Sequence, residues 1–184
     1  ELNNIIDKHI INAIGVEGPG EVIGGFDIGK IRHPSHFTLF IHKDGLIIQI
    51  YQIFMDGWDY TKQIELINQM MDRFKIKRIF YDATRGELES FFEQGIIRRG
   101  IWVPIKFTLQ EKFKIAGNFS KLVSNQTIRL QNNERQIKSI LSVNNNLESI
   151  ETPEGHGDAF WSIAMALSYK QSIGILVGAA GRHR

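Results

Sequence analysis

Residues 21–55 carry the pattern that most limits the possible folds: three apolar segments of strand length, the last two separated by a tight-turn signal. The segment EVIGGFDIG is short and apolar, as in a buried central strand, and its glycines allow another backbone or a ligand to approach. The segments HFTLFIHK and LIIQIYQIFM flank Asp44-Gly45, a dipeptide typical of two-residue hairpin turns. The pattern predicts three consecutive antiparallel strands.

Strand and helix patterns alternate in the remainder of the chain. Asp59 is a candidate N-cap for residues 60–74, whose apolar side chains recur at helical spacing. The further predicted elements are strand 77–83, helix 86–95, strand 101–107, helix 108–125, strand 127–130, helix 132–143 and a largely buried helix 156–171. Alternation of this kind predicts parallel additions to the sheet. The predicted fold class is therefore α/β, with a mixed sheet and flanking helices that resemble the ribonuclease H type.

The chain is expected to form one folded domain over residues 21–172. Residues 1–20 are interpreted as a lead-in or linker segment, broken by glycines and a proline, and residues 173–184 as a flexible tail. The first residue is not Met, which suggests a fragment or a processed product. The beginning of the chain lacks a secretory pattern, and no apolar stretch is long enough to span a bilayer. We therefore expect neither secretion nor membrane insertion.

The sequence contains no cysteine, which excludes disulfides, thiolate zinc sites and a cysteine nucleophile. A bound metal would need oxygen or imidazole ligands, and this favours Mg²⁺ or Mn²⁺ over structural zinc. The formal net charge of +2 permits binding to a polyanion without arguing for it.

Three aspartates are predicted to meet at one edge of the sheet. Asp27 and Asp82 end the first and fourth strands, which lie side by side in this topology, and Asp158 opens the last helix. Neighbouring carboxylates raise one another's pKa unless cations share them. Two divalent ions would offset their charge and hold a phosphodiester for cleavage. The alternative interpretation is that each is a helix cap, a first-turn helix residue or a surface residue, and this alternative is strongest for Asp158.

From about Glu21 to Tyr169 the chain resembles the nuclease domain of the large terminase subunit of tailed bacteriophages. The resemblance rests on GGFDIG, IFYDATRGE and GHGDAFWSIAMAL, which carry the three aspartates, and on KFTLQEKFKIAGNFSKLVSNQTIRL. It implies that these aspartates are the metal ligands. It also makes Lys112 a candidate contact of the scissile phosphate and places His156 beside the metal. His156 is interpreted either as a metal-shell ligand or general acid, or as a loop residue without a role.

The resemblance further implies a divalent-metal-dependent endonuclease that cleaves concatemeric double-stranded DNA during viral genome packaging, with little sequence specificity. The implied cofactor is Mg²⁺ or Mn²⁺ in a two-metal site. The implied partners are double-stranded DNA, an N-terminal packaging ATPase domain, the portal and the small terminase subunit, in the host cytoplasm and without a membrane. Two departures stand out. Lys30 and Arg32 lie where the family often has a second acid, and Glu87 is either an alternate ligand or, as we favour, a first-turn helix acid.

Other functions are compatible with parts of the pattern. A Holliday-junction resolvase or transposase-like nuclease can share the fold, and so can a non-catalytic DNA-binding or assembly module. An actin-like or sugar-kinase ATPase would need a second phosphate loop and an adenosine site, and the sequence shows neither. The segment Gly24–Lys30 fits G-x-x-x-x-G-K, but Ile31 follows where Ser or Thr is required, so an ATP site is rejected.

The remaining basic and aromatic residues are given structural interpretations. His33, His36 and His42 are expected to be surface or strand-end residues. Trp58, Trp102 and Trp161 are expected to be core or interface residues rather than base-stacking platforms. Four lysines are expected to cluster beside the aspartates: Lys106, Lys112, Lys114 and Lys121.

Overall fold

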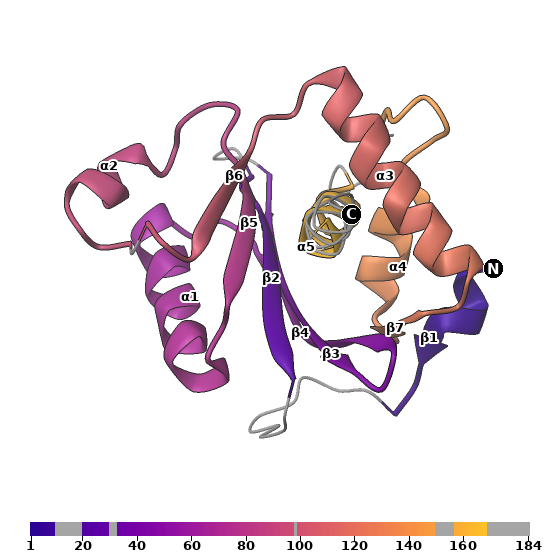
Figure 1. Ribbon diagram of the computed structural model, residues 1–184. Helices are drawn as coiled ribbons and strands as arrows, with labels where there is room; N and C mark the ends of the chain where they lie inside the picture. The colour runs from indigo at the N-terminus through magenta and orange to yellow at the C-terminus, as the bar shows by residue number, and fades with distance from the viewer. Residues whose placement is uncertain (10–19, 30–32, 98, 150–156, 169–184) are drawn as a thin grey trace, which may run out of the picture.

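The computed structural model describes residues 1–9, 20–29, 33–97, 99–149 and 157–168. Its strands are β1 (Ile6–Asp7), β2 (Glu21–Asp27), β3 (Ser35–Lys43), β4 (Leu46–Met55), β5 (Arg78–Asp82), β6 (Trp102–Ile105) and β7 (Ile128–Gln131). Its α-helices are α1 (Tyr60–Phe74), α2 (Glu89–Glu93), α3 (Leu109–Ser124), α4 (Glu134–Leu141) and α5 (Asp158–Leu167). One sheet lies between two groups of helices: α1 and α2 cover one face, and α3, α4 and α5 cover the other (Figure 1).

The predicted antiparallel meander is confirmed. β3 pairs antiparallel with β2 on one side and with β4 on the other. The β3–β4 turn falls at Asp44 and Gly45, which have φ angles of 51° and 77°, as a primed hairpin turn requires.

The later strands join this meander in parallel, as predicted. Over the described residues the strand order is β1-β7-β4-β3-β2-β5-β6. β5 lies parallel to β2, β6 lies parallel to β5 at the sheet edge, and β7 lies parallel to β4. Pro104 is in β6, where the missing amide donor is tolerated because one side of an edge strand is unpaired. The mixed α/β sheet is therefore confirmed.

Two elements differ from the prediction. The helix predicted over residues 86–95 is shorter, because Gly86 has a φ of 74°, outside the helical range, and α2 begins only at Glu89. Near the N-terminus, a 3-10 helix at Leu2–Ile5 leads into β1, which pairs with β7. This strand was not predicted from the sequence, because two paired residues are too few to show a strand periodicity. The boundaries of the folded domain stay a prediction.

Hydrophobic side chains form one core on each face of the sheet. The first core lies under α3, α4 and α5 and includes Phe40, Phe119 and Trp161. The second lies under α1 and α2 and includes Phe26, Phe37 and Trp102. None of the helices within the described ranges has both the length and the apolar character needed to cross a bilayer.

Helix α5 lies in the first core, and all ten of its residues are buried. It packs against β2, β3 and β5 and also against α3 and α4 (Figure 1). Its backbone approaches β2 so closely that a Cβ atom added to Gly25 would lie 1.8 Å from the Ser162 carbonyl oxygen. Because that obstacle is backbone, α5 itself would have to move to admit any side chain at residue 25.

We therefore expect Gly25→Ala to destabilise the protein by about 3 kcal/mol, at the upper end of the usual cost of overpacking a core. Gly117→Ala is the matched control, because Gly117 lies in α3 with no heavy atom near an added Cβ. That control should stabilise the protein by about 0.5–1 kcal/mol, since alanine is the better helix former. Urea unfolding followed by circular dichroism measures both. Equal stability of the Gly25→Ala variant and the wild type would contradict the close packing of α5.

Candidate functional site

The parallel pairing of β2 with β5 brings two carboxylates to one edge of the sheet. Phe26 of β2 is in register with Tyr81 of β5, and Asp27 and Asp82 are the next residue of each strand. Parallel strands end at the same edge, so both side chains leave the sheet together, as the sequence predicted.

Asp82 is held in place by its own turn. Its Oδ1 atom accepts hydrogen bonds from the Thr84 backbone N–H, at 2.9 Å, and from the Thr84 hydroxyl. The Thr84 oxygen in turn accepts the Phe107 N–H at 2.9 Å, which ties the end of β5 to the segment after β6. Thr84 is a positioning residue that sequence reasoning missed, although an Asp-x-Thr turn is a local signal.

Asp158 comes from the opposite layer, at the first position of α5. Gly157 precedes it with a φ of 75°, and an added Cβ there would lie 2.6 Å from the Val143 side chain. Asp158 is only 6% exposed, although helix N-termini usually face solvent. The structure therefore directs this carboxylate into the protein, towards the edge formed by β2 and β5.

The three aspartates line a single cavity of about 320 Å³, which we call the aspartate cavity. Its lining residues are Asp27, Ile28, Gly29, His33, Asp82, Arg85, Phe107, Lys112, Ser149, Asp158 and Trp161. The predicted convergence of Asp27, Asp82 and Asp158 is thus present in the structure. The metal-ligand and catalytic roles of these residues stay predictions.

The charges around the cavity oppose one another. Burial, followed by the negative charges of Asp158 and Asp82, raises the pKa of Asp27 well above its ordinary value. The positive charges of Lys112 and Arg85 lower the pKa of Asp27, but by less than the other effects raise it. Three carboxylates and two cations therefore meet in one partly enclosed space, an arrangement that favours a further bound cation.

Lys112 lies in the first turn of α3, where a positive charge is disfavoured by the helix dipole. Its Nζ atom lies 5.1 Å from the centroid of the Trp161 ring and 5.4 Å from that of Phe107. These aromatic faces hold the ammonium over the cavity. Of the four lysines expected beside the aspartates, Lys112 lines the cavity, and Lys106, Lys114 and Lys121 are absent from its lining.

Other residues considered for the site from the sequence are not seen in the cavity lining. Glu87 is absent from the cavity lining, and its nearest carboxylate oxygen lies 3.9 Å from Arg85. The favoured prediction of a first-turn helix acid is wrong, because α2 begins at Glu89 and Glu87 precedes it. His156, Lys30 and Arg32 lie outside the described residues. Within the described ranges, no three His, Asp or Glu side chains already form a closed metal-binding cluster, so the aspartates face a common space without meeting at one point.

His36 lies at the start of β3, so the expected strand-end position is confirmed, but it is not a surface residue. This histidine is fully buried, and its ring nitrogens lie 2.6 Å from the Ser162 hydroxyl oxygen and 3.2 Å from the Gln52 side-chain oxygen. Burial lowers the pKa of His36 to about 3, so the ring is neutral at ordinary pH. His36 is in register with Asp27 of β2 and forms a hydrogen bond with Ser162 of α5. It therefore connects β2 and α5, which carry Asp27 and Asp158. His33 and Arg85, which sequence reasoning left out of the site, both line the cavity.

Comparisons with known proteins give a likeness in structure only. No family model matches the sequence, and no curated protein matches it. The nuclease domain of the large terminase of Thermus phage P74-26 is similar with a TM-score of 0.72 and 18% identity, over 91% of this chain and 92% of that one. The large terminase nuclease of thermophilic phage G20c is similar with a TM-score of 0.67 and 18% identity, over 82% of each chain.

The G20c nuclease also matches in structures with bound magnesium, zinc and cobalt. The large terminase of bacteriophage HK97 is similar with a TM-score of 0.66 and 10% identity, over 86% of this chain but only 41% of that one. Identities this low establish the fold and leave the activity open. The chain has the ribonuclease H-like fold of large terminase nuclease domains, and the resemblance seen in the sequence is confirmed at that level.

Proposed function

We propose that this chain is a divalent-metal-dependent endonuclease of the large terminase type, which cleaves double-stranded DNA. The main support for this proposal is that Asp27, Asp82 and Asp158 line one cavity together with Lys112 and Arg85. The fold shared with terminase nucleases agrees with this function.

The donor set fits a hard divalent cation. The three aspartates offer carboxylate oxygens, which suit Mg²⁺ and Mn²⁺. The pKa of Asp27 is raised first by burial and then by the negative charges of Asp158 and Asp82, and a bound cation would offset those charges. Structures of the G20c nuclease with bound magnesium, zinc and cobalt support a divalent cation in a protein of this fold. When bound, the ion or ion pair supplies Lewis-acid stabilisation of the charge on the phosphodiester.

The protein's own groups orient the substrate. Lys112 and Arg85 provide the positive charge at the cavity that attracts a DNA phosphate. Lys112 is restrained by Trp161 and Phe107, so its ammonium is already placed when charge builds on the phosphate oxygens. Phosphate contacts carry no base information, which is why we expect little sequence preference.

The wider context is part of the proposal. The correspondence with 41% of the HK97 large terminase supports action beside a packaging ATPase domain. The portal, the small terminase subunit and the host cytoplasm follow from the same proposed role in genome packaging. His156 stays a candidate neighbour of the metal on the sequence resemblance alone.

Plasmid digestion tests the proposed function. Wild-type protein should produce scattered cuts with Mg²⁺ or Mn²⁺ and none in EDTA, because the carboxylates need the cation to hold a phosphate. Asp158→Asn should cut no better than the EDTA control. Asp72→Asn, at an exposed position of α1 outside the cavity, should cut like wild type. Strong cutting in EDTA, or one discrete site on every plasmid, would contradict the proposal.

Lys112→Ala should lower cleavage by roughly 10- to 1000-fold at saturating DNA, with the fold retained, as for the loss of one transition-state donor. Lys114→Ala is the matched control on the same helix, because Lys114 is exposed and lies 3.2 Å from Glu111. It should cut at the wild-type rate. Single-turnover cleavage with excess enzyme measures both variants. An unchanged rate for Lys112→Ala, or an equal defect in Lys114→Ala, would remove the assigned role.

A further inference from the structure

A second cavity, of about 400 Å³, adjoins the aspartate cavity. We call it the aromatic cavity, and its lining residues are Gly29, His33, Gly57, Trp58, Asp59, Tyr60 and Gln63. The two cavities share the lining residues Gly29 and His33. A DNA strand bound at the aspartates could therefore pass over Gly29 into the aromatic cavity. Nothing in the proposed cleavage reaction uses this second space.

The walls of the aromatic cavity suit a flat ring. Trp58 and Tyr60 lie around the start of α1 and are only partly buried, whereas Trp102 and Trp161 are buried in the cores. His33 adds a third ring at the boundary with the aspartate cavity. Trp58 and Tyr60 also pack against the second core, so the core contact expected for Trp58 is present, but both rings remain partly exposed and line the cavity. Aromatic rings that are accessible beside a phosphate-binding groove are the usual platform on which unpaired bases stack.

Polar groups restrain these walls. Gln63 is 3% exposed, and its Nε2 donates to the Trp58 carbonyl oxygen at 2.8 Å. The Gln63 Oε1 atom is buried and has no hydrogen-bond partner among the described residues. The hydrogen bond from Gln63 fixes the Trp58 backbone against α1, which keeps the Trp58 side of the cavity in place.

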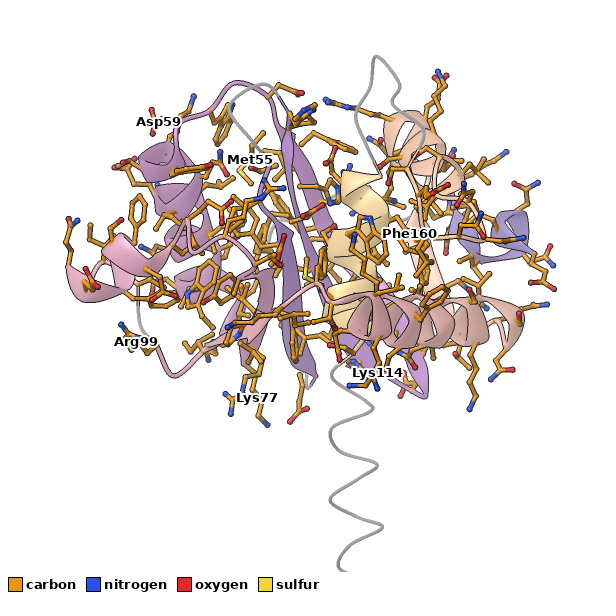
Figure 2. All side chains as sticks on the ribbon, turned by 90° about the horizontal axis from the view of Figure 1, so that it is seen from above. Met55, Asp59, Lys77, Arg99, Lys114 and Phe160 are labelled. Carbon is orange, nitrogen blue, oxygen red and sulfur yellow. The ribbon has the colours of Figure 1, made fainter. Side chains whose placement is uncertain are left out.

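The rim of the aromatic cavity carries one acid and one cation: Asp59 lines the cavity, and Lys62 lies beside it over the Trp58 ring. The Lys62 ammonium lies 4.2 Å from the centroid of that ring, and Lys62 is exposed. The neighbouring acid, Asp59, accepts the Lys62 backbone N–H at 2.8 Å as the cap of α1. Lys77, Arg99 and Lys114 lie along the opposite side of the molecule from Asp59 (Figure 2), so they do not contribute to this rim.

We propose that the aromatic cavity binds an unpaired nucleotide next to the scissile phosphate, with its base against Trp58 and Tyr60 and its phosphate near Lys62. This inference rests on the proposed nuclease function. A base reaches such a cavity only after leaving the duplex stack, and this costs least where the DNA is already unpaired. The enzyme therefore binds DNA with a few unpaired nucleotides beside the cut more tightly than fully paired DNA.

Binding to 2-aminopurine DNA tests the inference without requiring cleavage. The protein is the Asp158→Asn variant, and the probes are a fully paired duplex and a duplex with a short unpaired stretch, each carrying 2-aminopurine. We expect tighter binding of the unpaired probe, with a fluorescence change caused by stacking. Adding Trp58→Leu should weaken that binding by roughly five- to 150-fold, the range for losing one base-aromatic stack, and leave the paired probe nearly unaffected.

Three further variants separate stacking from a loss of fold. Trp58→Phe should retain most of the preference, because it keeps an aromatic face, and Tyr60→Leu should reduce it. Phe113→Leu removes a half-exposed aromatic of α3 outside both cavities and should change nothing. Thermal unfolding confirms that each variant is folded.

Equal affinity of the parent variant for both probes would overturn the inference, and so would wild-type binding by both Trp58→Leu and Tyr60→Leu. The second result is also the one expected if the cavity takes a protein side chain instead of a nucleotide. Plasmid cutting by the wild type is scored separately. If cutting occurs while Trp58 has no effect, the nuclease proposal stands and only the nucleotide site falls.

Discussion

The contact between the backbones of α5 and β2 determines where the candidate site can form. Only a residue without a Cβ atom lets the Ser162 carbonyl lie directly over Gly25. Because α5 lies this close to the sheet, its first residue, Asp158, lines the same cavity as Asp27 and Asp82 at the ends of β2 and β5. The His36 ring adds a bond between Ser162 and the strand next to β2. The position of Asp158 therefore depends on a close approach two residues before Asp27.

This packing brings like charges together at a cost in free energy. Burial and two neighbouring carboxylates disfavour ionised Asp27, and Lys112 and Arg85 offset only part of that effect. A bound cation would relieve this repulsion between the carboxylates. The relief contributes to the affinity of the site for the cation. In the proposed nuclease, these charges would make phosphate binding depend on a metal ion, because the carboxylates alone would repel a phosphate. Unfavourable electrostatics in an otherwise well-packed fold are typical of functional sites.

The sequence predicted those features that depend on local patterns. The hairpin at Asp44-Gly45, the cap at Asp59 and the edge position of Pro104 each have a short-range cause, and the structure confirms all three. The convergence of the aspartates was predictable because parallel strands end together. The strand-end position of His36 was predicted, but its burial was not, because burial depends on Ser162, 126 residues away, and histidine carries no local signal of burial. Arg85 and His33 were missed because both are loop residues, whose side-chain directions follow from tertiary structure.

We propose that Asp27, Asp82 and Asp158 share divalent cations, and anomalous diffraction from a crystal soaked in Mn²⁺ would locate those ions. One or two strong peaks are expected inside the aspartate cavity, with oxygen atoms of all three carboxylates at roughly 2.0–2.6 Å from manganese. An empty cavity at saturating Mn²⁺, or manganese bound elsewhere on the protein while the three carboxylates stay apart, would contradict it.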